Sequence, residues 1–187
     1  MRMSIKLLVL VLPALFVGGC TDVDAGPEVR AESANLSEGK SITVDRVSQA
    51  KPQERIQLIA PQDGVVFVHS TIFPSQANVT DLSGIRGVYL FVPAKFVVAA
   101  KEGDPVSIAQ ADGLLAMEYS KNDAFPENYC FQQLSEGAIS LRAGDDGAEM
   151  VIESHLKTSS VSEPTDARCD VSEFANTTTF PLPPEAP

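Results

Sequence analysis

The sequence predicts a mainly β protein, an antiparallel β-sandwich with one or two short helices. Short runs of apolar and β-branched residues recur along the chain, separated by turn residues. Few segments have the length and repeat of a helix, and two cysteines far apart in the second half suit a long-range disulfide. An immunoglobulin-like sandwich and a closed β-barrel remain open, although the chain lacks the tryptophan of true immunoglobulin domains.

Eight segments have the pattern of β-strands. The early ones alternate between apolar and polar residues, whereas the third and fourth are almost continuously apolar and are expected to be buried on both faces. The expected strands are Ser41–Val47, Arg55–Ile59, Val65–Phe73, Gly87–Val92, Val106–Gln110, Leu114–Tyr119, Ala138–Arg142 and Glu149–Leu156. The aromatic residues in apolar runs are expected in the core, namely Phe67, Phe73, Tyr89, Phe91, Phe96, Tyr129 and Phe131.

Turn and helix signals divide these segments. Ala111–Gly113 and Gly144–Gly147 are rich in aspartate and glycine, and each predicts a hairpin between the strands that flank it. Ala94–Glu102 and Glu127–Leu134 each follow a proline and precede a glycine, which is the punctuation of a helix. One or both are therefore expected to be short helices.

The ends of the chain differ in composition from the middle. Residues 21–40 are polar and poor in large apolar side chains, so residues 20–40 are expected to form a flexible tether. Residues 181–187 are rich in proline and are expected to form an extended tail. Residues 41–180 would then form a single β-rich domain.

The first twenty residues carry a targeting pattern. Arg2 and Lys6 give a positive start, and Leu7–Val17 is an apolar run shorter than the roughly 20 residues that cross a bilayer. Val17-Gly18-Gly19-Cys20 then closes this run, and it resembles the lipobox of bacterial lipoprotein signal peptides. The alternative is an ordinary signal peptide with a cysteine near its cleavage site by chance.

The resemblance implies a membrane anchor. Residues 1–19 would be removed, and Cys20 would become the first residue and carry a diacylglyceryl group and an acyl chain such as palmitate. Several acyl chains together anchor a protein stably. Because Thr21 rather than aspartate follows the cysteine, the resemblance also implies the outer membrane, with the domain facing the periplasm or the cell surface.

The assignment of Cys20 to lipid leaves an even pair of thiols. Cys130 and Cys169 are 39 positions apart, and an oxidising compartment favours a disulfide between them. Closing a loop of that length is expected to stabilise the fold by about 4 kcal/mol. The chain has no Cys-X-X-Cys motif, which a redox-active pair would typically use.

The charge balance limits the class of partner. The chain has 25 acidic and 14 basic residues, and removing Arg2 and Lys6 with the signal segment gives 12 − 25 = −13. Nucleic-acid binding is disfavoured because phosphate contacts need clustered basic residues. An acidic domain of this kind is attracted to cationic partners or divalent ions, although solubility alone also accounts for the charge.

No motif points to catalysis, a metal or a cofactor. The two histidines, His69 and His155, each lie in an expected strand and lack the spacing of metal ligands, so structural roles are expected for both. The Asp145-Asp146 pair could in principle bind calcium, but turn geometry alone accounts for it. We therefore expect no catalytic residue, no bound metal and no cofactor.

The function predicted from these features is that of a non-enzymatic protein-binding or assembly module of the cell envelope, anchored by lipid. Exposed strand edges would give such a module a way to add a partner's strand. One alternative is an envelope hydrolase of unfamiliar type, whose site would bring His69 or His155 together with carboxylates or a serine. Another is a carbohydrate-binding module, which would need an exposed row of aromatic rings.

Overall fold

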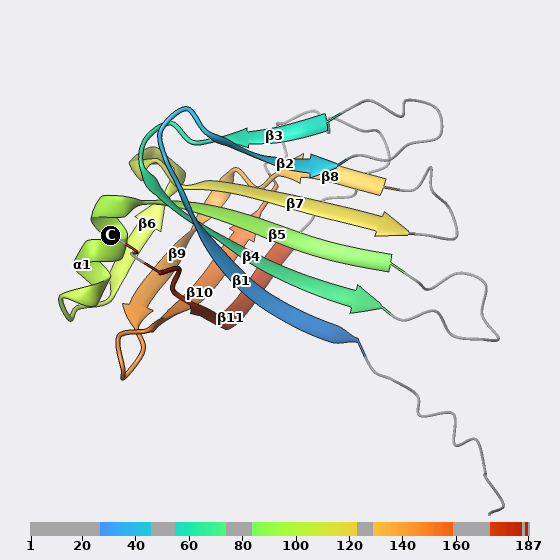
Figure 1. Cartoon of the computed structure of the whole chain (residues 1–187). Helices are drawn as coiled ribbons and strands as arrows, with labels where there is room; N and C mark the ends of the chain where they lie inside the picture. Colours follow the sequence, from blue (N-terminus) through green and yellow to red (C-terminus); the bar gives the residue numbers. More distant parts are fainter. Residues whose placement is uncertain are drawn as a thin grey trace, which may run out of the picture.

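The computed structural model describes residues 27–45, 55–73, 84–122, 129–158, 173–184 and 186, and it confirms the predicted antiparallel β-sandwich (Figure 1). The two facing sheets do not close into a barrel. The five-stranded sheet has the order β1 (Glu28–Leu36), β4 (Gly64–Phe73), β5 (Gly84–Pro93), β7 (Leu115–Asn122), β8 (Tyr129–Gln133). The four-stranded sheet has the order β11 (Glu173–Pro181), β10 (Glu149–Lys157), β9 (Glu136–Ala143), β6 (Val106–Ala109).

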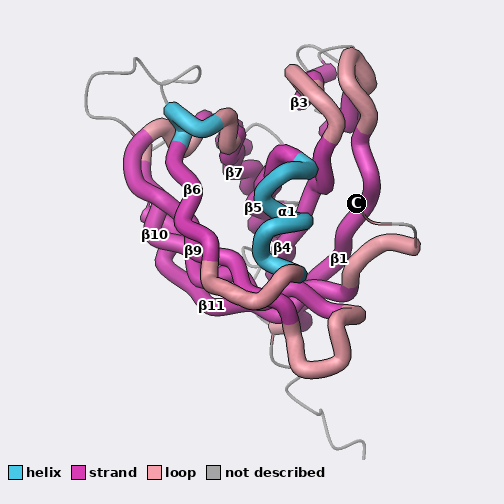
Figure 2. The backbone as a smooth tube through the Cα atoms, turned by 90° about the vertical axis from the view of Figure 1, so that its left-hand side faces the viewer, coloured by secondary structure: helices cyan, strands magenta, loops and turns pink. Residues whose placement is uncertain are grey.

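Three smaller elements complete the fold. The strands β2 (Ser41–Asp45) and β3 (Arg55–Ile59) pair with each other as a separate two-stranded sheet. Helix α1 (Ala94–Lys101) follows β5, and the 3-10 turn η1 (Gln110–Asp112) follows β6. Figure 2 shows α1 between the two main sheets, where Val97 and Ala100 join the core. Within the described ranges, no helix is long and apolar enough to cross a membrane.

The core lies between the two main sheets. Alternate residues of each strand point inward, as Val65 and Phe67 do in β4 and as Ile139 and Leu141 do in β9. The other face of β4 and β5 is also buried at one end, where Val66 and Phe91 lie in a second apolar cluster with Leu58. The near-continuous apolar runs of these two strands follow from burial on both faces.

Two predictions about turns and helices are confirmed. The helix expected at Ala94–Glu102 is α1, which ends one residue earlier. The turn at Gly144–Gly147 joins β9 to β10 as a hairpin, with Gly147 in the left-handed region at a φ of 69°. The expected core position is also confirmed for Phe67 and Phe91, which are fully buried, whereas Tyr89 and Phe96 are half-buried. The side chains of Phe73, Tyr129 and Phe131 lie outside the described set.

The hairpin predicted around Ala111–Gly113 is wrong. The turn exists, and Gly113 has a φ of 97°, but β6 and β7 belong to different sheets. The chain crosses from one sheet to the other at this point, and Leu114 is completely buried at the crossing. A local turn signal does not distinguish a hairpin from a crossover between sheets.

Of the two segments with helix punctuation, the second, Glu127–Leu134, does not form a helix. Its residues 129–133 form β8, which pairs with β7 over five positions. The glycine that was expected to end a helix, Gly137, instead lies inside β9 with a φ of 103°. A side chain there would overlap the backbone of His155, so close packing between strands requires this glycine.

Both expected boundaries of the domain are wrong as well. Part of the expected tether, Glu28–Leu36, forms β1 and pairs with β4 along nine positions. The expected tail begins inside β11, Leu182 packs against the core, and its N–H donates to the carbonyl of Ala148 at 2.8 Å. The segment that contains β1 is polar because β1 is an outer strand with one exposed face, and this composition resembles that of a linker.

Candidate functional site

The inner surface of the sandwich changes from apolar to polar along its strands. The inward residues of β4 run from Phe67 to His69 and Thr71, and those of β5 run from Leu90 through Val88 to Arg86. In β7 the inward series reaches Glu118, which is only 4% exposed. The α1 end of the sandwich is therefore an ordinary core, whereas the other end contains groups that can bind a ligand.

Strand β11 crosses over this polar end from the opposite sheet. Phe180 packs edge-on against Phe67 with ring centroids 5.3 Å apart, which fixes one end of the crossing. Phe174 lies beside His69, with centroids 5.5 Å apart and planes tilted by 57°. These two aromatic contacts place the inward side chains of β11 over β4.

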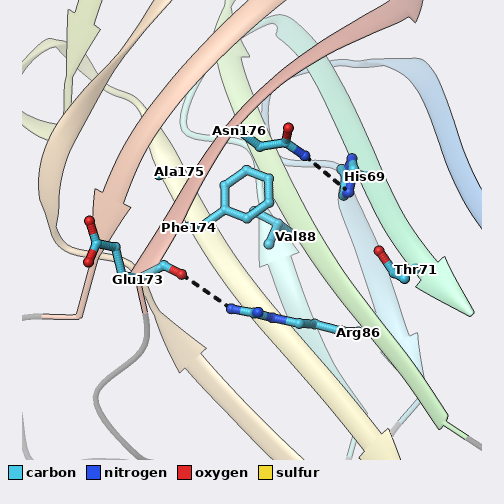
Figure 3. Close-up of a pocket in the computed structure, with 8 residues that line it drawn as sticks. All are labelled: His69, Thr71, Arg86, Val88, Glu173, Phe174, Ala175 and Asn176. Carbon is cyan, nitrogen blue, oxygen red and sulfur yellow. Dashed lines mark hydrogen bonds between the residues drawn. The ribbon is translucent and has the colours of Figure 1, made fainter. Parts of the chain in front are cut away.

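A pocket of about 210 Å³ opens between β11 and the two central strands (Figure 3). In Figure 3 the Phe174 ring lies between Asn176, His69 and Arg86, and the Glu173 carboxylate points away from them. The residues that line the pocket are His69, Thr71, Arg86, Val88, Glu173, Phe174, Ala175 and Asn176.

The charge of Arg86 is matched inside the sandwich. Its Nε donates to Oε1 of Glu118 at 2.5 Å, and the two side chains are 44% and 5% exposed. Gln132 Nε2 donates to the other oxygen of the Glu118 carboxylate at 3.0 Å. A buried carboxylate needs such partners to keep its charge. This network leaves little net positive charge for an anionic ligand.

Arg86 also links the two sheets. Its Nη2 donates to the backbone carbonyl of Glu173 in β11 at 3.3 Å. The same guanidinium thus bonds to the five-stranded sheet through Glu118 and to the four-stranded sheet through Glu173. The rim of the pocket is positioned by a polar contact, in addition to the aromatic packing below it.

His69 is held by β11 as well. Its Nε2 lies 3.5 Å from Nδ2 of Asn176, and its Nδ1 lies 3.2 Å from the hydroxyl oxygen of Thr178. An amide nitrogen only donates, so Nε2 accepts and Nδ1 carries the hydrogen that is donated to Thr178. Burial, and to a lesser extent the nearby Arg86, lowers the pKa of His69. The hydrogen bond from Asn176, the burial of the ring and the positive charge of Arg86 therefore all favour the neutral imidazole.

This geometry is suited to binding more than to catalysis. The Nδ1 hydrogen points to Thr178, so the ring is not arranged to remove the proton of that hydroxyl. Within the described chain, no carboxylate lies within hydrogen-bond distance of the His69 ring to orient it as a base. What the pocket offers is a set of fixed donors and acceptors next to an aromatic ring.

The second histidine lies away from the pocket. His155 faces the exposed side of β10, where its Nε2 lies 3.2 Å from Oε1 of Glu153. The inward residues of the same strand are Met150, Ile152, Ser154 and Leu156. The structure therefore does not bring His69 and His155 together.

The cysteines can be placed only in part. Cys130 lies in β8 opposite Ser120, but its side chain is outside the described set. Cys20 and Cys169 are outside the described residues. The lipid attachment and the Cys130–Cys169 disulfide stay predictions.

The acidic turn is explained by local bonding. The Asp146 carboxylate accepts the N–H of Ala148 at 2.9 Å, and this contact closes the turn between β9 and β10. Among the residues whose side chains are described, no cluster of histidine, cysteine, aspartate or glutamate could hold a metal ion.

Several site residues were not singled out from the sequence, among them Arg86, Glu118, Phe174 and Asn176. Glu118 did carry a signal, because it continues the inward series of Leu114 and Ala116 and places a charge on the core face. The residues of β11 carried none, because their role comes from a contact with strands about a hundred positions earlier.

Comparisons with known proteins add no relative: no protein-family model, curated protein or solved structure matches this chain.

Proposed function

We propose that this chain is a lipid-anchored lipoprotein of the cell envelope and that its β-sandwich is a non-enzymatic protein-binding module. The observation that carries the binding role is the state of the pocket. Its one histidine is held neutral and is paired on both ring nitrogens, so it contributes a fixed shape and fixed hydrogen bonds instead of a reactive base.

The anchor is supported by the lipobox-like segment Val17-Gly18-Gly19-Cys20. Because β1 begins at Glu28, only residues 21–27 connect the lipidated cysteine to the first strand. A connection of that length reaches at most about 30 Å even when fully extended. The module would therefore act close to the membrane surface, on a partner that is itself at or near the membrane.

The anchor is tested by the variant Cys20→Ala. We expect this variant to lose the incorporation of a palmitate analogue and to move from the membrane fraction to the soluble fraction. Thr21→Ser is a matched control, because it changes the next residue and keeps the cysteine. Unchanged labelling and unchanged fractionation of Cys20→Ala would contradict the lipoprotein proposal.

The binding role is tested by cross-linking in intact cells. We expect one envelope protein to be recovered with the chain in a constant ratio, and a tag on that protein to recover the chain in turn. The hydrolase alternative predicts instead that His69→Ala stops the turnover of an envelope substrate. If no partner is recovered in both directions and His69→Ala stops the turnover of an envelope substrate, the hydrolase hypothesis would replace the binding hypothesis.

A further inference from the structure

The backbone of β11 has one side paired with β10 and one side that faces away from it. The N–H of Leu182 donates to the carbonyl of Ala148 as the β10–β11 register continues, so even-numbered positions of β11 bond to β10. Odd-numbered positions therefore turn their N–H and C=O groups outward. Two contacts agree with this direction, because the outward carbonyls of Glu173 and Pro181 accept hydrogen bonds from Arg86 and from the Ser33 hydroxyl.

Three residues between these contacts keep an outward backbone without a partner. Ala175, Thr177 and Thr179 are all exposed, and nothing in the described chain bonds to their outward N–H and C=O groups. The neighbouring strand β1 makes its two bonds to this region only at the far end, from Ser33 to Pro181 and from Asn35 to Pro184. Among the described residues, the middle of β11 is therefore an open strand edge.

This edge lacks the usual features that prevent pairing. Natural edge strands are protected by lysine, proline, bulges or covering elements. From Phe174 to Thr179 the strand contains no proline and no charged residue, and it pairs with β10 in continuous register. Its three consecutive threonines, Thr177–Thr179, are also strong strand formers.

We propose that this edge of β11 binds an extended segment of a partner protein as an added strand. This inference rests on the proposed binding function and assigns that function to one surface of the molecule. The added strand would run beside Ala175, Thr177 and Thr179 and would satisfy their outward backbone groups. Main-chain bonds of this kind give affinity with little dependence on sequence.

The pocket would supply the specificity. It begins where the open edge ends, because Ala175 and Asn176 are part of its lining. Side chains of an added strand alternate between faces, so a side chain on the inner face, beside Phe174 or Asn176, would point toward the pocket. The volume of about 210 Å³ is roughly seven times the 30 Å³ that a water molecule occupies, which suffices for a side chain of moderate size.

The lining favours an uncharged side chain that forms hydrogen bonds. The charge of Arg86 is matched by Glu118, the His69 ring is held neutral, and Glu173 presents its carbonyl while its carboxylate points away (Figure 3). Thr71 and Asn176 add a hydroxyl and an amide. A charged group would lose its hydration there without meeting an opposite charge.

The charge of the surface selects a partner over a second copy of the chain. β1 and β11 together carry Glu28, Glu32 and Glu173 against the single cation Arg30, and the whole chain has a net charge of −11. Two copies paired edge to edge would repel each other, whereas a segment with a net positive charge would be attracted.

The test uses the purified full-length chain and a displayed library of random peptides of about ten residues, the upper length of ordinary strands. We expect the selected peptides to be basic and to share one uncharged polar position. We also expect their binding to slow hydrogen exchange at the amides of Ala175, Thr177 and Thr179.

A matched pair of variants separates the edge from other surfaces. Thr177→Pro removes an outward N–H and should weaken peptide binding by about tenfold or more, whereas Thr177→Val keeps the N–H and should bind within about twofold of the original. Thr71→Val should weaken only those peptides that carry the shared polar position. If Thr177→Pro does not fold, hydrogen exchange in the unmodified chain tests the proposal instead, because peptide binding at this edge must protect the amides of Ala175, Thr177 and Thr179.

Several outcomes would overturn this inference. These are failure to select any peptide, equal binding by Thr177→Pro and Thr177→Val, and protection of amides elsewhere in the chain. Self-association that protects the same three amides would identify a second copy as the occupant and would also overturn it. A cellular partner that still cross-links to the Thr177→Pro protein would keep the proposed function and reject this edge alone.

Discussion

At the scale of single residues, His69 shows how a polar side chain is accommodated at the boundary of a core. The ring is 8% exposed and lies against Phe174, with a hydroxyl and an amide placed at its two nitrogens. Protonation would cost more here than in water, because the ring would lose hydration and would meet the positive charge of Arg86.

The lowered pKa of His69 predicts a pH dependence of stability. The unfolded chain, with a histidine pKa of about 6.5, binds a proton before the folded protein does, so the unfolded state gains protons as the pH falls. The contribution of His69 to the stability is therefore fully present above about pH 6.5. It decreases as the pH falls from there toward the lowered pKa of the folded state. The measurement is the urea midpoint between about pH 7.5 and 5, above the range of ordinary carboxyl groups.

A variant of this histidine gives the comparison. His69→Gln should flatten this part of the pH profile, because it removes the group whose pKa is lowered by burial. Equal slopes for His69→Gln and the original chain would show that the pH dependence arises elsewhere.

At the scale of elements, periodicity predicted the strands that contribute to the centre of the sheets. β4, β5, β9 and β10 were all expected close to their observed positions, because each carries a run of apolar residues in its own sequence and pairs with the strand next to it in the chain. β1 and β11 were missed. Each has one exposed face, and what stabilises it is pairing with a strand that the local sequence does not reveal.

Two glycines with positive φ, one inside a strand and one in a turn, should differ in how much an added side chain destabilises the protein. Gly137 has a φ of 103°, and a Cβ there would overlap the His155 carbonyl, so Gly137→Ala should destabilise the protein by about 3 kcal/mol or more. Gly39 has a φ of 71° but open space around it, so Gly39→Ala should cost only about 1 kcal/mol. Free energies of unfolding in urea measure both, and similar costs would argue against the close approach of β9 and β10.

At the scale of the whole molecule, β11 connects the two sheets that the rest of the chain builds. Phe180 was expected to be the last residue of the domain, next to an extended tail, and it is 1% exposed and packs against Phe67 of the opposite sheet. The candidate site could not be predicted for the same reason. Its two sides come from strands that are adjacent only after the sandwich has formed, and neither side carries a motif.

A truncation of one side chain tests this role of β11. Phe180→Ala should lower the free energy of unfolding by about 3–5 kcal/mol, the cost of removing a fully buried aromatic ring. Val29→Ala is the control, because Val29 is 59% exposed and should change stability by no more than about 0.5 kcal/mol. A cost for Phe180→Ala below about 1 kcal/mol would mean that β11 is not required for the packing of the two sheets.

The position of β11 in chain order has a consequence for biogenesis. Strands β1 to β10 are synthesised first, but they contain neither Phe180 nor the pocket residues Phe174 and Asn176. Until Glu173–Pro181 arrives, β10 itself is an open edge, and His69 and Phe67 face water. The newly made chain therefore passes through a stage vulnerable to proteolysis and aggregation, which ends when β11 pairs with β10.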